Sequence, residues 1–419
     1  MQNEDYLFGF WEKGPGFSEG FSDFPRALNG KSISAGLVAA IFGCTGPALV
    51  TISSAQAAGF TMEQTVSWLF GIYVFGGLIS IVMASYYKMP IVGAYSIPGA
   101  AMMATGLLGF TFNEAVFAFL VAALIVGILG VTGLVGKIMQ ILPMPIVMGM
   151  IVGVMLRFGI GIVNSVVSAP VIAGSTVLAF FIMPKLVKAK VPPVVWGLAA
   201  GVIAVVVTGG FTGDGQAVQY IPPQLVMPHV NVATILSVSV PLAMLVIGAE
   251  NAQAYGVLKS QGYKTPINAM SFISGAICVG ANIFGGHNAN IAGPMTAICS
   301  STEGGDDVKD RYSAAIVCGI AFAVFGIFAS FAIAFIGLVP GALVSTLAGL
   351  AMINVLINSL TAAFKTGRCK MGAFVSFIIG ASGITVFSIG AAFWALLIGL
   401  AVTVFFESED FKAYREGEA

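Results

Sequence analysis

Two short polar stretches interrupt this very hydrophobic chain where continuous membrane helices are expected. The first covers residues 89–100 and reads Met-Pro-Ile-Val-Gly-Ala-Tyr-Ser-Ile-Pro-Gly-Ala. The second covers residues 284–296 and reads Phe-Gly-Gly-His-Asn-Ala-Asn-Ile-Ala-Gly-Pro-Met-Thr. Each has small and polar residues before a Pro/Gly pair, which is typical of a helix start. Short, Gly/Pro-interrupted segments in corresponding places of two halves indicate the binding site of a secondary transporter.

A half-helix that begins at membrane depth offers unpaired N–H groups and partial positive charge at its N-terminus. The backbone at such a start is therefore as good a candidate for binding a substrate as the side chains around it. The candidates are Tyr95, Ser96, Ile97 and Gly99 in the first stretch, His287, Asn288, Asn290 and Gly293 in the second, and Glu250, Asn251 and Gln253 in a neighbouring segment, with Thr45 and Arg157 as further candidates.

Glu250 is the exception among the acidic residues, almost all of which lie in expected tails or loops. It precedes Lys259 by nine residues, which places it about 13 Å from the inner face at 1.5 Å per residue. An intramembrane carboxyl is costly and functional by default. Desolvation disfavours its charged form, so Glu250 is a candidate carrier of a coupling proton. The alternative is a structural carboxyl that is bonded to neighbouring backbone.

The remaining polar candidates also have structural alternatives. His287 is a second candidate for proton coupling, against a structural hydrogen bond. Asn288 and Asn290 suit a polar solute or satisfy the interrupted backbone. Arg157, the only basic residue inside an expected segment, is a counter-charge for the substrate or a partner of backbone carbonyls.

Composition excludes several classes of protein. The 419 residues are 58% hydrophobic and 9% charged, against about 25% charged in soluble domains, so we expect a multi-pass protein of the lipid bilayer. A net charge of zero lacks the excess of basic residues that is typical of proteins that bind nucleic acids. The five cysteines have no paired spacing, so neither disulfide nor metal is expected. We expect no cofactor and no catalytic residues, because no phosphate loop, nucleophile–base pair or cluster of carboxylates occurs.

Apolar segments and basic residues together predict the topology. We expect fourteen segments near 33–56, 62–87, 90–111, 114–135, 143–166, 170–187, 191–209, 234–257, 266–283, 284–302, 312–337, 340–362, 371–388 and 389–407. With this count every basic residue in the loops, the tails and the segment ends falls on one side, which is then cytoplasmic and holds both termini. These residues are Lys13, Arg26, Lys31, Lys88, Lys137, Lys185, Lys188, Lys190, Lys259, Lys264, Lys309, Arg311, Lys365, Arg368, Lys370, Lys412 and Arg415.

The long loop at 210–233 divides the chain into two halves of seven segments. Residues 32–209 and 234–408 then form inverted repeats, because an odd number of segments reverses the second half. The interrupted segment is the third in each half, so the two half-helices point toward one another, and their extended runs can pair. Residues 1–31 and 409–419 are expected to be cytoplasmic. The aromatic residues of the first of these either rest at the membrane interface or belong to a partly ordered tail: Tyr6, Phe8, Phe10, Trp11, Phe17, Phe21 and Phe24.

Over residues 30–405 the chain resembles the benzoate:proton symporter (BenE) family. The resemblance rests on Pro-Ile-Val at 90–92, Ser-Ile-Pro-Gly-Ala-Ala at 96–101, Asn-Glu-Ala at 113–115, Leu-Arg-Phe-Gly at 156–159, Phe-Gly-Gly-His at 284–287, Asn-Ile-Ala at 290–292 and Thr-Ala-Ile-Cys at 296–299. It implies a fold similar to nucleobase transporters, with a core domain (segments 1–4 and 8–11) that moves against a gate domain (segments 5–7 and 12–14). It also implies an inner-membrane location and a possible homodimer.

One departure from the family opens an alternative function. Glu250-Asn251 stands where the family is expected to have Gln-Asn, and Gln253-Ala254 where it has Pro-Gly. The leading hypothesis is proton-coupled uptake of a small aromatic carboxylate such as benzoate, with Glu250 as the proton carrier. A carboxylate at this place also suits a nucleobase or another neutral heterocycle with N–H donors. A channel-like conductor of anions is a third hypothesis.

Overall fold

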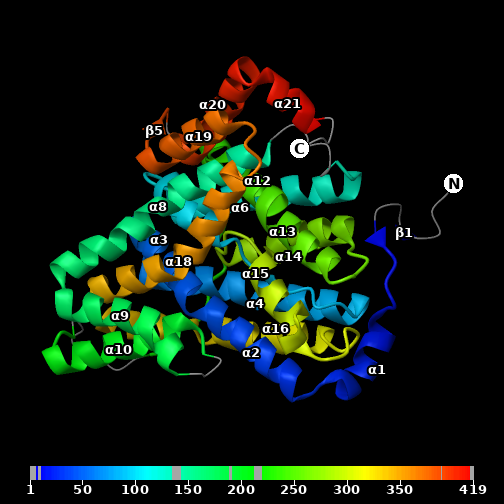
Figure 1. Cartoon of the computed structure of the whole chain (residues 1–419), viewed down its shortest axis with the longest axis horizontal. Helices are drawn as coiled ribbons and strands as arrows, with labels where there is room; N and C mark the ends of the chain where they lie inside the picture. Colours follow the sequence, from blue (N-terminus) through cyan, green and yellow to red (C-terminus); the bar gives the residue numbers. More distant parts are fainter. Residues whose placement is uncertain are drawn as a thin grey trace.

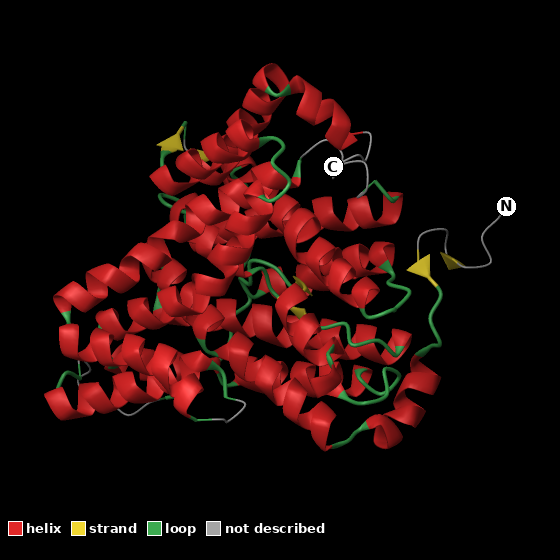
Figure 2. Ribbon diagram, viewed as in Figure 1, coloured by secondary structure: helices red, strands yellow, loops and turns green. Residues whose placement is uncertain are grey.

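The computed structural model describes residues 6–7, 11–134, 143–187, 191–211, 219–387 and 389–415. These described residues are almost wholly helical, and their strands form three two-residue pairs (Figure 2). Lys137, Lys188, Lys190, Phe8 and Phe10 lie outside the described residues, as does part of the expected 210–233 loop.

The first half of the chain contains α1 (Phe17–Ala27), α2 (Gly30–Cys44), α3 (Gly46–Ala57), α4 (Met62–Tyr87), β3 (Gly93–Ala94), α5 (Ile97–Gly106), α6 (Phe112–Thr132), α8 (Met144–Ser168), α9 (Pro170–Leu186) and α10 (Pro193–Thr208). The second half begins with one continuous helical stretch of five elements, α11 (Val232–Thr234), η1 (Ile235–Ser239), α12 (Val240–Leu245), η2 (Val246–Asn251) and α13 (Ala252–Ser260). It continues with α14 (Ile267–Ile283), β4 (Asn290–Ile291), α15 (Gly293–Ser300), α16 (Tyr312–Ile327), α17 (Ala329–Leu338), α18 (Gly341–Phe364), α19 (Lys370–Ser382), β5 (Thr385–Val386), β6 (Ile389–Gly390), α20 (Ala391–Phe406) and α21 (Ser408–Arg415).

The chain is a multi-span membrane protein. Among the described residues, six helices are long and apolar enough to cross a membrane, or up to eight if each bent pair is one span. Four shorter apolar helices accompany them: α9, α10, α14 and α19. The six long helices have 21–28 residues each, which is enough for the roughly 20 residues that a span requires.

Two of the expected segments differ in the structure. The segment expected at 312–337 is bent by 63° between α16 and α17. The segment expected at 371–388 ends at Ser382 and is followed by the β5–β6 hairpin. In the second case Gly383 adopts φ +62° and ends the helix, as glycine commonly does at this position.

The helices pack in two groups (Figure 1). In the first group, α16 packs against α2 and α4, and α14 packs against α4 and α6. In the second, α8 packs against α18 and α19, and α9 packs against α10. Small residues allow the close approach within each group. A methyl group on Gly77 of α4 would lie 2.3 Å from the carbonyl oxygen of Gly319 on α16.

Candidate functional site

The two interrupted stretches meet in the middle of the first helix group. Strands β3 and β4 pair antiparallel, with Gly93 opposite Ile291 and Ala94 opposite Asn290. This confirms the predicted pairing of the two extended runs. Helix α4 supports β3 from one side, because the Ser80 hydroxyl bonds to both the N–H and the carbonyl of Gly93, at 2.8 and 2.9 Å. Extended backbone at this depth is tolerated because it is buried in protein.

Glu250 lies at the start of the half-helix α5. Its carboxyl interacts with the hydroxyl of Ser96 and the backbone N–H of Ile97, and the residue is only 5% exposed. Ser96 is the N-cap of α5 and accepts a hydrogen bond from the N–H of Gly99 at 3.0 Å, as N-cap residues do. In the described part of the chain no basic side chain forms an ion pair with Glu250.

The segment that carries Glu250 has an unusual backbone. Residues 246–251 form the π-helical turn η2, and π-helical turns occur frequently at functional sites. Gly248 of this turn faces open space, since no atom lies within 4 Å of the position of an added methyl group. The sequence predicts a continuous apolar segment at 234–257, and the positions of proline and glycine in it do not indicate this π-helical turn.

The second half-helix, α15, begins without a side-chain cap. A methyl group on Gly293 would lie 2.6 Å from the side chain of Gln253, so this amide covers the helix start. Gln253 is itself exposed. The N-terminus of α15 is therefore contacted by a polar side chain that is itself accessible from outside the packed protein.

His287 is held between two partners. The indole N–H of Trp68 donates to its Nδ1 at 2.9 Å, and Nε2 lies 2.9 Å from the carbonyl oxygen of Ser96. Because an indole only donates, Nδ1 accepts and Nε2 carries the proton that is donated to Ser96. Both ring nitrogens are thus engaged inside the protein, and the imidazole fixes the carbonyl of the residue that caps α5. Trp68 has no sequence signal that would have linked it to the site.

The asparagines of the second stretch also bond within the protein. The Asn288 Oδ1 accepts from the N–H of Ser96 at 3.1 Å, and its Nδ2 donates to the Oδ1 of Asn290 at 2.8 Å. Asn290 in turn donates to the carbonyl of Ile291 at 2.8 Å. Buried polar groups are costly unless they are paired, and this chain of bonds satisfies the interrupted backbone.

Tyr95 and Asn251 point into the protein. The hydroxyls of Tyr95 and Tyr73 lie 2.8 Å apart, and Tyr95 is 1% exposed. The side chain of Asn251 contacts Ser271 and Ser274 on α14, each at 3.4 Å. Both residues lie beside the site and stabilise its wall.

Thr45 and Arg157 lie where the two helix groups touch. Thr45 separates α2 from α3 and bonds to the carbonyl of Ile41 at 2.7 Å. It lines an apolar cavity of about 110 Å³ together with residues of α10, α17 and α18. Arg157, on α8, donates to the carbonyl of Ala101 on α5 at 3.2 Å. No acidic side chain among the described residues forms an ion pair with Arg157.

The site combines a buried carboxyl, two helix starts and an arginine near the first of them. It suits reversible binding of a polar or charged group and of a proton. Within the described ranges no cluster of three or more His, Cys, Asp or Glu residues is placed to hold a metal ion.

Comparisons with known proteins agree with this picture. A family model described as "Benzoate membrane transport protein" (BenE) matches residues 27–405. The inner membrane protein YdcO of Escherichia coli (strain K12) is 30% identical over 370 residues, which cover 88% of this chain and 94% of the relative. The benzoate membrane transport protein of Acinetobacter baylyi is 26% identical over 366 residues, which cover 87% of this chain and 92% of the relative.

Solved structures show the same fold. The transmembrane domain of the cyanobacterial bicarbonate transporter BicA aligns with a TM-score of 0.59 at 16% identity, over 90% of this chain and 97% of that one. The structure of SLC26A9 aligns with a TM-score of 0.59 at 15% identity, over 92% of this chain and 67% of that one. The family is one of transporters and not of enzymes. This chain therefore belongs to the benzoate membrane transport protein (BenE) family.

Proposed function

We propose that this chain is a proton-coupled secondary transporter that imports a small aromatic carboxylate of the benzoate type by alternating access. One observation supports the coupling of transport to protons. Glu250 is a buried carboxyl at a helix start with no cationic partner in the described part of the chain. An unpaired carboxylate is costly at this depth, so a proton is the natural partner of Glu250. The name of the Acinetobacter relative supports the substrate class.

The proposed architecture has fourteen segments in two inverted repeats of seven, residues 32–209 and 234–408. The first helix group would form a core domain and the second a gate domain, which touch where α3 packs against α18 and α5 packs against α8. Both termini are proposed to be cytoplasmic, in the inner membrane, and the protein is proposed to form a homodimer. The inner-membrane name of the Escherichia coli relative supports this location.

At the site, the start of α15 would hold the substrate carboxylate, because it has no side-chain cap and carries partial positive charge. The start of α5 carries the same partial charge beside it, while its N–H groups at Ile97 and Gly99 are engaged by Glu250 and Ser96. We assign direct contact with the substrate to Ser96, Ile97, Gly99, Gly293 and Gln253. The polar side chains that already bond within the protein would position these groups instead: Tyr95, Asn251, His287, Asn288 and Asn290. Glu250 would carry the proton.

A neutral heterocycle is the second candidate substrate. The observation that favours it is Glu250 itself, since a carboxylate accepts hydrogen bonds from the N–H groups of a nucleobase. Arg157 favours the carboxylate substrate, because a cation at membrane depth whose hydrogen bond among the described residues goes to one carbonyl suits a negative ligand. A channel-like conductor would need neither residue.

The experiment is uptake of labelled benzoate and of labelled uracil into proteoliposomes under an imposed pH gradient, inside alkaline. The proposal expects saturable benzoate uptake that stops when a protonophore collapses the gradient. Benzoic acid also crosses lipid unaided, so protein-free liposomes and Glu250→Gln proteoliposomes are the controls. Uptake of uracil but not of benzoate would overturn the substrate assignment, and uptake unaffected by the gradient would overturn the coupling.

A further inference from the structure

The N-terminal segment from Trp11 to Ala27, here called the clasp, is bonded to the ends of three helices of the first group. The carboxylate of Glu12 accepts hydrogen bonds from the N–H groups of Asn268 and Ala269 in the first turn of α14, both at 2.9 Å. The N–H of Gly16 donates to the carbonyl of Tyr86 in the last turn of α4 at 3.0 Å. A carboxylate at a helix N-terminus is stabilising, so this end of the clasp is firmly docked.

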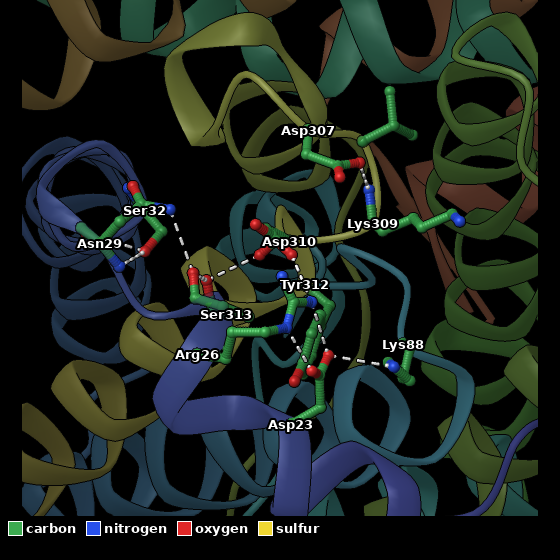
Figure 3. Close-up of polar contacts among 12 residues, drawn as sticks. Asp23, Arg26, Asn29, Ser32, Lys88, Asp307, Lys309, Asp310, Tyr312 and Ser313 are labelled. Carbon is green, nitrogen blue, oxygen red and sulfur yellow. Dashed lines mark hydrogen bonds and ion pairs between the residues drawn. The ribbon is translucent and has the colours of Figure 1, made fainter.

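The helix of the clasp, α1, is held by charged contacts that Figure 3 shows together. Asp23 pairs with Arg26 at 2.6 Å and with Lys88 at 3.0 Å, and Arg26 also pairs with Asp310 at 2.8 Å. The hydroxyl of Tyr312 on α16 donates to the carbonyl of Gly20 at 3.0 Å. Lys88 ends α4 at φ +50°, a backbone conformation that is uncommon for lysine. Its ion pairs with Asp23 and Glu19 of α1 help to hold this conformation.

The faces of α1 differ sharply. Gly20 and Ala27 are buried against the protein, and a methyl group on Gly20 would clash with the backbone of Ser85. Phe17 and Phe21 are 43% and 52% exposed, and their rings stack with centroids 6.2 Å apart. On the third side, Ser18 and Ser22 are exposed. The charged contacts thus point toward the protein or the polar side, while two phenylalanines point away from the protein.

The exposed phenylalanines lie close to two helices that are long and apolar enough to cross a membrane. Helix α2 follows α1 after two residues and begins the first span. Its exposed apolar residues Ile33, Leu37 and Ile41 recur at every fourth position, which places them on one face of the helix. Phe17 also packs against Tyr86, at the end of α4, with ring centroids 5.1 Å apart. Aromatic residues at the end of a span are typical of the membrane interface.

We propose that α1 is an interfacial helix whose Phe17 and Phe21 insert into the boundary between headgroups and acyl chains, and that the clasp thereby anchors the first helix group to the bilayer surface. The occupant is lipid and not a protein partner, because α1 precedes the first candidate span by two residues and its Phe17 packs against Tyr86 at the end of another candidate span. Helices of this kind bury their apolar face by about 5–10 Å at the interface. The hydrogen bonds and ion pairs described above join the clasp to α4, α14, α16 and the loop before α16, so the anchor moves with the first group.

The test compares two adjacent positions of α1 in the full-length protein. Phe21→Cys and Ser22→Cys are made in a background whose five native cysteines are replaced and whose substrate binding is retained. Each is labelled with bimane and reconstituted in lipid nanodiscs. Fluorescence is then quenched by a nitroxide on the upper acyl chain of the lipid, or by iodide in the buffer.

We expect the lipid nitroxide to quench position 21 several-fold more than position 22, and iodide to show the opposite order. Phe17→Cys and Ser18→Cys form a second matched pair in case a label at position 21 disturbs the helix. Equal lipid quenching at both positions of the two pairs would overturn the proposal, as would stronger iodide quenching at the phenylalanine positions. Greater lipid quenching at the serine positions would mean that α1 is rotated and would also overturn it.

Discussion

Replacing Gly76 with alanine tests whether the placement of β3 controls the site. Gly76 lies on α4, and its added methyl group would meet three backbone atoms of Ala94, the oxygen at 2.6 Å, the Cα at 2.8 Å and the carbonyl carbon at 2.9 Å. Ordinary contact begins at 3.4 Å, so α4 and β3 must separate by about 0.8 Å, the difference between 3.4 and 2.6 Å. Backbone atoms cannot rotate away as a flexible side chain does.

Two opposing effects act on stability. Overpacking of this kind costs about 1–3 kcal/mol, whereas alanine is favoured over glycine in a helix by about 1 kcal/mol. The free energy of unfolding should therefore fall only slightly. The effect on the site should be larger, because β3 leads directly into Ser96 and the start of α5, and a binding site tolerates a displacement of only about 0.5 Å. We expect benzoate affinity to fall by at least about tenfold, which corresponds to roughly 1.4 kcal/mol.

The assay is equilibrium binding of benzoate to the purified protein, with thermal unfolding measured on the same samples. Gly174→Ala on α9 is the matched control, because no atom lies within 4 Å of its added methyl group, and its binding should equal that of the native protein. If Gly76→Ala binds benzoate as tightly as Gly174→Ala, the reasoning from β3 to the site is refuted.

Further predictions follow from the same contacts. Glu12→Ala should lower the free energy of unfolding by about 1 kcal/mol by removing the cap of α14, which a thermal shift would show; an unchanged midpoint would contradict this. Trp68→Phe leaves Nδ1 of His287 without its donor and should cost about 1–3 kcal/mol in the same assay, whereas no loss would mean that this bond is not formed. Arg157→Gln should weaken binding of benzoate while leaving neutral benzamide unchanged, and equal weakening of both would exclude a charge effect. Arg26 and Lys88 hold the pKa of Asp23 well below its usual range. The stability from these contacts is therefore fully present above about pH 4 and lost only as the pH falls through the lowered pKa. Iodide quenching at position 21 should then be constant between pH 5 and 7, and a change in that window would contradict the docking of α1.

The sequence was most informative where glycine and proline interrupt apolar segments. The Pro/Gly pairs near Pro98 and Gly293 predicted two extended runs followed by half-helices, and the β3–β4 pairing confirmed it. Local residue types were sufficient there, because proline fixes φ and removes a hydrogen-bond donor, whereas the conformational freedom of glycine disfavours a continuous helix.

Other features depend on contacts between distant parts of the chain. His287 and Trp68 are 219 residues apart, and no spacing rule links them. The 63° bend between α16 and α17 falls at Phe328, a residue type that does not break helices, so the sequence favoured one continuous segment. The π-helical turn at Glu250 was missed for the same reason, because its residues are compatible with an ordinary α-helix.

The sequence alone did not decide whether the N-terminal segment is ordered. Its aromatic residues suited either the membrane interface or a loose tail. The structure shows a helix from Phe17 to Ala27 that is held by ion pairs with residues more than 60 positions away. Those pairs become visible only when the chain folds, since each partner alone has the composition of a solvent-exposed loop.

The most direct test of the proposed function is equilibrium binding to the purified protein across pH 5–8, with benzoate and uracil compared in the native protein and in Glu250→Gln. We expect benzoate to bind the native protein more tightly at low pH. We also expect Glu250→Gln to bind benzoate without responding to pH, because the proton carrier is gone. Binding of uracil that Glu250→Gln abolishes, with no binding of benzoate, would contradict the proposed function and make Glu250 a ligand of a neutral heterocycle.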